Sequence, residues 1–390
     1  MTHMKVLYYT STAFMDVSVE VINVLKSLVE LHVLIELTPG SKNENIIDIN
    51  TLPTDEVFVS LPQLLTEKDY QHLHPYISGV ASINFVVHAR KSMSTSFNTS
   101  MKVFQYVKNI QPDIYHLEAL QIRSVGLLPS ILLVKKMLVA VHDPLPHSGE
   151  TSWKINLTRF SFFRYPILKG YLLYSRFARQ QFDKYNPQLK SARYELRLNS
   201  YSYYRNYLNG QDKERKHILF FGRLSPYKGI DVLLEAFPYV LKQFPNENLV
   251  IAGKSFDGYE PDAEVIRQNK ESITVLNRYI TNKELVTLVS QAKFIVCPYK
   301  DATQSGVLMT AYALDTPVIA SDVGAFPEYI QDNVTGMLVP VNDPVKLAEK
   351  MVAALQNGFY KEMEMNLSKK DKTSSWATEN TEEFMNAYAL

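Results

Sequence analysis

The sequence predicts an α/β protein made of two doubly wound domains, each with a parallel sheet covered by helices on both faces. The chain has 390 residues, more than one hydrophobic core usually holds, so about two domains are expected. Short apolar runs rich in β-branched residues recur along it, and the longer segments between them show the apolar spacing of helices. Continuous apolar strands that alternate with helices are typical of parallel sheets.

Eleven short apolar runs are expected to form buried strands. Those in the first half are KVLYYT (5–10), HVLIEL (32–37), SINFVVHA (82–89), DIYHLE (113–118) and MLVAVHD (137–143). Those in the second half are HILFFG (217–222), NLVIAG (248–253), ITVLN (273–277), FIVCPY (294–299), PVIAS (317–321) and GMLVP (336–340). Between them, segments such as GIDVLLEAFPYVLKQF (229–244) have the apolar periodicity of helices. The two series of strands therefore predict two sheets.

Polar segments separate these series. The first boundary is expected near the turn-prone segment 198–217, just before the second series of strands begins. A second break is expected at the lysine- and serine-rich segment 366–375. Residues 376–390 are predicted to form one more amphipathic helix.

Composition excludes several classes of protein. A net charge of +1 argues against a general nucleic-acid-binding protein. One cysteine, Cys297, excludes an internal disulfide framework and a cysteine-based zinc cluster, which suits a reducing compartment. The chain runs from MTHMKVLYYTS directly into a strand and has no stretch of about 18 uncharged apolar residues, so neither a signal peptide nor a spanning helix is expected.

The segment ILFFGRLSPYKGIDVLLEAF (218–237) carries the strongest functional signal. A strand is expected to end at Gly222, and Arg223 and Lys228 flank a short loop that opens into a helix. Glycine lets the backbone approach a ligand closely, and a helix N-terminus offers N–H groups and a partial positive charge. With two cations, this arrangement suits a diphosphate. On spacing alone, two solvated side chains on an ordinary turn explain it equally well.

Four segments together resemble the donor-binding half of retaining glycosyltransferase family 4. They are FFGRLSPYKGIDVLLEAF, LVIAGKS, FIVCPY and PVIASDVGAFPEYIQDNVTGMLVPVNDPVKLAEKM, in the family's order and spacing. The first half resembles the family mainly in its strand pattern and in VHD (141–143). The resemblance implies the GT-B fold: two Rossmann-like domains with a cleft between them and a last helix that crosses back onto the N-terminal domain.

Domain roles follow from this resemblance. Residues 1–200 together with 373–390 are expected to form an N-terminal acceptor-binding domain. Residues 201–372 are expected to form a C-terminal domain that binds the nucleotide-sugar donor. By the same resemblance, Gly222, Arg223 and Lys228 hold the donor diphosphate, and the two cations stabilise it as it leaves. No cofactor and no metal ion are expected, and neither half has a DxD-type pair beside a predicted strand end.

The segment DATQSGVLMTAYALDTPVIASDVGAFPE (301–328) departs from the family. Members usually carry two glutamates, eight positions apart, that contact the donor sugar and the ribose; these positions fall here at Ala302 and Thr310. We expect a variant sugar-binding loop in which Asp301 or Gln304 contacts sugar hydroxyls. Backbone N–H groups around Ser305, Gly306 and Val307 are expected to meet sugar or phosphate. Helix capping is the alternative for the serine and threonine, and Thr310 reaches less far toward the ribose than a glutamate.

The segment NRYITN (277–282) occupies the family's usual base-binding turn. A glycine is common there, and this chain has Arg278, which is expected to add a phosphate contact. The backbone near Tyr279 and Ile280 is expected to border the base.

The first half offers histidines at two predicted strand ends. His142 is expected to face the crevice where open α/β sheets bind ligands, and the resemblance implies contact with the donor sugar near the reaction centre. Asp143 is expected to orient its imidazole ring and to lie on the acceptor side. His147 is a weaker candidate on the acceptor side. His116 is expected to have a structural or acceptor-side role.

Asp16 and Ser18 stand where many relatives have a glycine-rich loop. Both suit capping of the following helix; lining of the acceptor side is the alternative.

The stretch 151–200 contains ten Lys or Arg against two acidic residues. Five aromatic residues lie among these cations: Trp153, Phe160, Phe162, Phe163 and Tyr165. Docking on an anionic membrane and packing in the core explain this pattern equally well.

These patterns favour an enzyme that transfers a hexose-type unit from a nucleotide sugar to a hydroxyl of a glycan or lipid-linked acceptor, in surface polysaccharide synthesis. A cytoplasmic location is expected, with peripheral contact at the inner face of the cell membrane through 151–200. A sugar-nucleotide epimerase of the same fold and a non-catalytic binding protein derived from a transferase are the alternatives. The missing glutamates count against the epimerase, and Arg223, Lys228 and His142 count against the binding protein.

Overall fold

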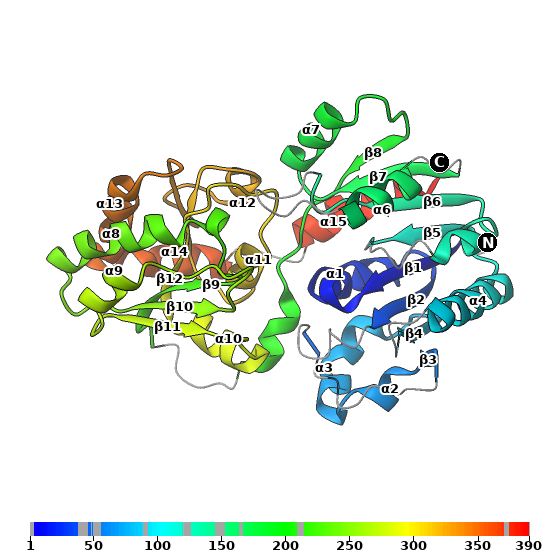
Figure 1. Cartoon of the computed structure of the whole chain (residues 1–390), viewed down its shortest axis with the longest axis horizontal. Helices are drawn as coiled ribbons and strands as arrows, with labels where there is room; N and C mark the ends of the chain where they lie inside the picture. Colours follow the sequence, from blue (N-terminus) through cyan, green and yellow to red (C-terminus); the bar gives the residue numbers. More distant parts are fainter. Residues whose placement is uncertain are drawn as a thin grey trace.

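The computed structural model describes two α/β bodies that lie side by side (Figure 1). The described residues are 4–37, 46–47, 49, 56–88, 93–118, 120, 126–144, 153–163, 167–208, 214–369 and 374–389. Each body contains one sheet, which confirms the α/β fold class with two doubly wound units.

The first sheet has eight strands in the order β3-β4-β2-β1-β5-β6-β7-β8. They are β1 (Lys5–Ser11), β2 (Glu30–Leu37), β3 (Phe58–Val59), β4 (Ser82–Val87), β5 (Ile114–Leu117), β6 (Lys136–Ala140), β7 (Leu168–Leu173) and β8 (Ala192–Glu195). β3 pairs antiparallel with β4, and the other pairs are parallel. The chain builds outward from β1 and then crosses to β5 on its other side. A topological switch point therefore lies between β1 and β5, where ligands bind in such sheets.

Helices cover both faces of this sheet. They are α1 (Met15–Leu25), α2 (Leu61–Leu64), α3 (Glu67–Ile77), α4 (Met93–Ile110), α5 (Leu128–Ile131), α6 (Trp153–Phe163), α7 (Arg176–Tyr185) and α15 (Ser374–Ala389), with the 3₁₀ turn η1 (Thr12–Phe14). Side chains of α1, α3 and α15 join one buried cluster, and those of α4 to α7 join another. Alternate strand residues serve the two clusters, as Val6 and Leu7 of β1 show. Burial on both faces explains the continuous apolar runs.

The second sheet has six parallel strands in the order β11-β10-β9-β12-β13-β14. They are β9 (His217–Phe221), β10 (Leu249–Gly253), β11 (Ile273–Asn277), β12 (Ala292–Cys297), β13 (Val318–Ser321) and β14 (Gly336–Val339). Its helices are α8 (Ile230–Gln243), α9 (Ala263–Gln268), α10 (Asn282–Ser290), α11 (Gly306–Ala313), α12 (Phe326–Tyr329), α13 (Pro344–Leu355) and α14 (Phe359–Lys369), with the 3₁₀ turns η5 (Pro226–Lys228) and η6 (Gln356–Gly358). Its switch point lies between β9 and β12.

The chain passes between the two sheets twice. It first runs from β8 through the 3₁₀ turn η4 (Ser202–Tyr207) to β9. It then returns in α15, which lies with the first body in Figure 1. There the Asn380 side chain accepts from the Arg197 N–H at 2.9 Å and donates to the Arg197 carbonyl at 2.8 Å. The expectation that the last helix crosses back is therefore confirmed.

Side chains of α12 also join the two bodies. The Glu328 carboxylate accepts from the backbone N–H groups of Arg176 and Phe177, at 3.0 and 2.7 Å, in the first turn of α7. The hydroxyl of Tyr329 accepts from the Leu198 N–H at 2.9 Å. A carboxylate at a helix N-terminus satisfies open N–H groups and complements the helix dipole. The second body therefore stabilises a helix of the first.

Two strands of the first sheet lie inside the basic stretch 151–200 and were not predicted. In β7, Lys169 and Gly170 interrupt the apolar run, yet the rest of the strand is buried. Phe162 and Phe163 of α6 are also buried, at 0% and 8% exposure, so the docking interpretation is wrong for these two rings. Phe160 is 61% exposed. The side chains of Trp153 and Tyr165 lie outside the described residues.

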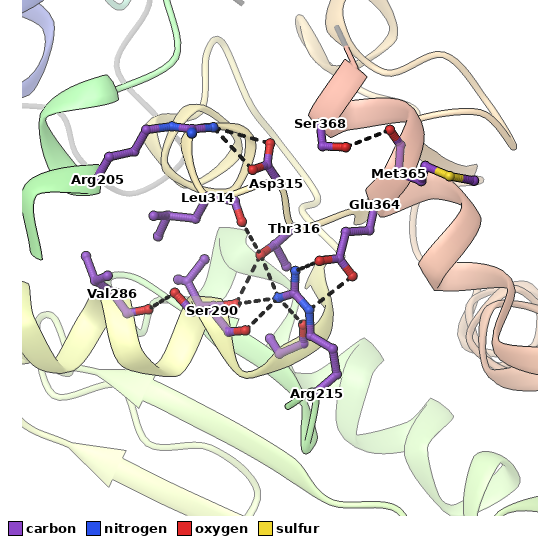
Figure 2. A network of polar contacts seen from close by, with 12 residues as sticks. Arg205, Arg215, Val286, Ser290, Leu314, Asp315, Thr316, Glu364, Met365 and Ser368 are labelled. Carbon is purple, nitrogen blue, oxygen red and sulfur yellow. Dashed lines mark hydrogen bonds and ion pairs between the residues drawn. The ribbon is translucent and has the colours of Figure 1, made fainter. Parts of the chain in front are cut away.

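Arg215 holds several elements of the second body together (Figure 2). Its guanidinium, whose side chain is 5% exposed, contacts the Glu364 carboxylate of α14 at 2.6 and 3.2 Å. It also donates to the carbonyls of Ser290 and Ala292, each at 2.8 Å, and to the Thr316 hydroxyl at 3.1 Å. One buried cation thus joins α14 to the end of α10, the start of β12 and the loop before β13.

Candidate functional site

The carboxyl ends of the strands place the predicted site residues. Gly222, Arg223 and Lys228 follow β9, and the segment 301–310 follows β12. These strands flank the switch point of the second sheet. In the first sheet, residues 12–16 follow β1, one of the two strands that flank its switch point. The predicted residues therefore lie where doubly wound sheets bind ligands.

A cavity of about 470 Å³ lies between the two bodies. Its lining residues from the first body are Thr12, Ala13, Met15, Asp16 and Ile46, and Tyr204 comes from η4. Those from the second body are Gly222, Arg223, Tyr279, Ile280, Asn282 and Leu285. Four residues predicted to bind the donor thus share a cavity with Asp16, predicted for the acceptor side.

The loop after β9 brings Arg223 to this cavity. Gly222 has φ +120°, in the region that favours glycine, and an added Cβ would lie 3.4 Å from Val307 at the start of α11. The Arg223 guanidinium lies 4.7 Å from the ring centre of Phe256. Such a contact limits the motion of the side chain while leaving the residue exposed. The loop therefore presents a cation at the mouth of the second sheet.

Lys228 lies at the end of η5, just before α8. Its ammonium lies 3.8 Å from the ring centre of Tyr299 and 4.9 Å from that of Tyr227. Gly229 follows with φ +67°, and a Cβ there would lie 1.9 Å from the Pro298 carbonyl oxygen. Only glycine fits this turn, which places Lys228 beside the end of β12.

The turn after β11 differs from expectation at Arg278. Its guanidinium forms an ion pair with Glu284 at 2.5 Å and donates to the Tyr279 carbonyl at 3.1 Å. The predicted phosphate contact would have to replace that pair. Tyr279, 39% exposed, and Ile280 line the cavity as expected for residues near a base.

Some residues of the loop after β12 cap or bond to α11, and one of them contacts the first body. Ser305 is the N-cap of α11, and its hydroxyl accepts from the Leu308 N–H at 3.3 Å. Thr310 is 3% exposed and donates to the Gly306 carbonyl at 2.9 Å, so its hydroxyl serves its own helix. Gln304 donates to the backbone carbonyl of His142 at 3.0 Å. Asp301 is partly exposed.

His142 follows β6 and has a partner that the sequence did not indicate. Its Nε2 lies 2.8 Å from Oε1 of Glu118, at the end of β5. Burial by itself raises the pKa of Glu118, but the contacts with His116 and His142 outweigh it and the pKa is lowered. Burial lowers the pKa of His142, but the Glu118 contact outweighs it and the pKa is raised. Glu118 thus has a direct contact with the ring that the sequence did not indicate, and Asp143 acts on the ring as well.

A second cavity, of about 190 Å³, lies beside His142. Its lining includes Glu118, Asp143, Thr158 and Arg159. Arg159 of α6 donates to the backbone carbonyls of Pro144, at 2.9 Å, and of Asp143. Asp143, which is predicted to lie on the acceptor side, thus lines this cavity.

The remaining first-half candidates have different outcomes. α1 begins at Met15 after Phe14, so the expectation that Asp16 and Ser18 cap it is wrong. Burial raises the pKa of Asp16, which lines the larger cavity, to about 6. Ser18 is fully buried and its hydroxyl lies 2.6 Å from that of Thr10, away from the cavity lining. His147 lies outside the described residues.

The described part of the chain shows no cluster of His, Cys, Asp and Glu suited to a metal ion. In the same residues, no helix is long and apolar enough to cross a membrane.

The fold is that of GT-B glycosyltransferases. Sucrose-phosphate synthase from Thermosynechococcus elongatus matches with a TM-score of 0.64 at 16% identity, covering 99% of each chain. Anabaena HepE, solved with UDP and glucose, matches with a TM-score of 0.65 at 12% identity, covering 100% of each chain. These likenesses confirm the expected fold.

Sequence comparison finds a family model that is similar to the second body. Residues 215–357 match the model of glycosyl transferases group 1. Phosphatidyl-myo-inositol mannosyltransferase from Mycobacterium tuberculosis is 32% identical over 164 residues, which cover 40% of this chain and 42% of that protein. An uncharacterized glycosyltransferase from Methanocaldococcus jannaschii is 31% identical over 189 residues, 48% of each chain. The matched stretch thus spans less than half the length of these relatives.

Proposed function

We propose that this chain is a retaining glycosyltransferase that moves a sugar from a nucleotide-sugar donor to a hydroxyl of a glycan or glycolipid. The observation that supports this most is the 470 Å³ cavity between the two bodies, which joins Gly222, Arg223, Tyr279 and Ile280 to the loop after β1. A donor bound on the second body there faces the first body, where an acceptor has room beside it.

The cations act on the leaving group. As the bond from the anomeric carbon to the diphosphate oxygen breaks, negative charge develops on the diphosphate, and Arg223 and Lys228 stabilise it. The acceptor oxygen forms the new bond to the same carbon, and its proton passes to an oxygen of the departing diphosphate. His142, fixed by Glu118, contacts the sugar. Asp301, Gln304 and the first N–H groups of α11 hold the sugar hydroxyls, and no metal ion takes part.

The acceptor is a lipid-linked or growing surface glycan. One relative is named for its action on phosphatidyl-myo-inositol, and a neighbour of similar fold was solved with a GlcNAc-glycerol and UDP. Peripheral contact with an anionic membrane would use the outer face of α6, where Leu157 and Phe160 are 44% and 61% exposed. Residues 153–182 contain no acidic residue, which suits an anionic surface. We therefore propose that the enzyme acts at the inner face of the cell membrane.

A thermal-shift panel of nucleoside diphosphates tests the donor site. One member is expected to raise the free energy of unfolding by about 2.7 kcal/mol at 100 times its dissociation constant. The matching nucleoside without phosphates is the control and should stabilise far less. Sugar transfer from the corresponding nucleotide sugar, assayed in excess chelator, then separates an enzyme from a binding protein. A panel without any shift would contradict the proposal.

The loop 301–310 gives a second test. Asp301→Ala is expected to weaken binding of the nucleotide sugar by about 1.5–3 kcal/mol if the carboxylate accepts a hydrogen bond from a sugar hydroxyl. The bare nucleoside diphosphate should bind almost unchanged, because it contacts Arg223 and Lys228. Gln304→Ala is expected to weaken binding of the nucleotide sugar by about 0.5–1.5 kcal/mol. Dissociation constants for the two ligands are compared by calorimetry, and equal weakening of both would make the loop a phosphate-site element instead.

A further inference from the structure

A chain of buried polar side chains leads from the C-terminal helix to His142. The hydroxyl of Tyr388 in α15 lies 2.8 Å from Nδ1 of His116. Nε2 of His116 lies 3.2 Å from one oxygen of Glu118, and Nε2 of His142 lies 2.8 Å from the other. His116 and Glu118 are fully buried and Tyr388 is 2% exposed. The last turn of the chain is thus connected to a residue at the candidate site.

The chemistry of these groups assigns the protons. Both Nε2 atoms face Glu118 at ion-pair distance, and an ionised carboxylate, which can only accept, favours nitrogens that carry hydrogen. The Tyr174 hydroxyl, 2.7 Å from Oε1, also donates to it. The Tyr388 hydroxyl occupies Nδ1 of His116. A buried carboxylate needs a compensating cation. His142 has the shorter contact with Glu118, so the geometry favours His142 for this role.

The His142 ring is fixed on its faces as well as at its edge. Phe14 lies 4.6 Å from it, centre to centre, and Tyr174 stacks at 5.0 Å with a 17° angle between the planes. The charged groups that face it are Glu118 after β5, Asp16 of α1 and Asp143 on its own strand end. His142 lines the smaller cavity, and because Nε2 faces Glu118, Nδ1 is the nitrogen on the other side of the ring.

We propose that Glu118 is a positioning residue that keeps His142 protonated with Nε2 turned inward, so that Nδ1–H is a fixed donor toward the cleft. Tyr388 contacts Nδ1 of His116, and we infer that this contact limits the competition of His116 with His142 for Glu118. The C-terminal helix therefore sets the charge of a site residue more than 240 positions earlier in the chain. This role deepens the proposed function and rests on it for its use in transfer, but the charge of His142 can be measured without any turnover.

The test is an NMR titration of full-length protein with labelled histidine, in which His142→Gln identifies the His142 signal. Wild-type protein is expected to show His142 titrating above the ordinary value of about 6.5. In Glu118→Gln, which keeps the shape and removes the charge, the midpoint should fall by about one unit or more. Asp143→Asn is the matched control, because Asp143 also faces the ring but raises the pKa of His142 less than Glu118 does, so the midpoint should shift less. An equal shift in the two variants would overturn the proposal.

Tyr388→Phe tests the connection to α15 and serves if Glu118→Gln does not fold. It deletes one oxygen, and circular dichroism checks that the fold remains. Without that hydroxyl the His116 ring loses its partner at Nδ1, its contact with Glu118 changes, and the His142 midpoint should move away from its wild-type value. An unchanged midpoint would overturn the role of Tyr388. Absence of sugar transfer with normal titrations would count against the proposed function alone, so the two failures can be told apart.

Discussion

Arg223→Ala and Lys228→Ala are each expected to lower the turnover of sugar transfer by about 10²–10³-fold, since one preorganised donor to developing charge contributes about 2.7–4 kcal/mol. The loss should appear in kcat, because the diphosphate is more negative when it leaves than when it is bound to the sugar. Steady-state kinetics with the donor found by thermal shift measures it.

Arg267→Ala provides the control for these two variants. Arg267 is an exposed cation of the same body, its side chain 72% exposed and paired with Glu264, and it does not line the cavity. Its removal should leave kcat unchanged. If all three variants behave alike, net charge of the body and not the position of Arg223 and Lys228 determines the rate, and the assignment is wrong.

Arg215→Leu is expected to destabilise the protein by about 3–5 kcal/mol, because it leaves the Glu364 carboxylate and several carbonyls without their buried partner. The effect should appear as a lower midpoint of urea unfolding at constant slope. It should also be larger than the effect of most single substitutions.

Arg205→Ala is the comparison, because Figure 2 shows it in a second pair close to the first. Its contact with Asp315 is 3.2 Å long and its side chain is 47% exposed. Exposed pairs contribute about 0–1 kcal/mol; this pair is exposed only on the Arg205 side, with Asp315 10% exposed, so the variant should destabilise the protein less than Arg215→Leu does. Equal destabilisation by the two variants would mean that burial of Arg215 is not what makes its contacts matter.

The fold was predictable because most of its strands are buried on both faces and therefore consist of continuous apolar segments in the sequence. β7 and β8 were not predicted, for local reasons. Lys169 and Gly170 interrupt β7, and β8 is a short strand at the edge of the sheet whose residues are mostly half-buried. Cations near them suggested a surface, yet Arg193 places its guanidinium 5.5 Å from the ring centre of Phe182, so a basic side chain covers the core there.

The site was predictable where a local pattern contains it. Gly222 and Arg223 stand in one loop, and the cavity includes both. Glu118 was missed because its role depends on His142, which reaches it from the next strand of the sheet and not from its own segment. Arg278 was assigned to phosphate because the sequence does not show which acidic group pairs with it; six residues later, Glu284 does. Long-range pairing of charges is set by topology, and spacing alone does not reveal it.

The carboxylate of Glu328 at the start of α7 has a consequence for how the protein unfolds. The first body contains a helix whose open N–H groups are satisfied from the second body, and it is completed by α15, which comes after the second body in the chain. Residues 1–200 alone lack both. Loss of the second body would fray α7 and remove the helix that packs beside α1, so the two bodies should melt together as one cooperative unit despite having separate sheets.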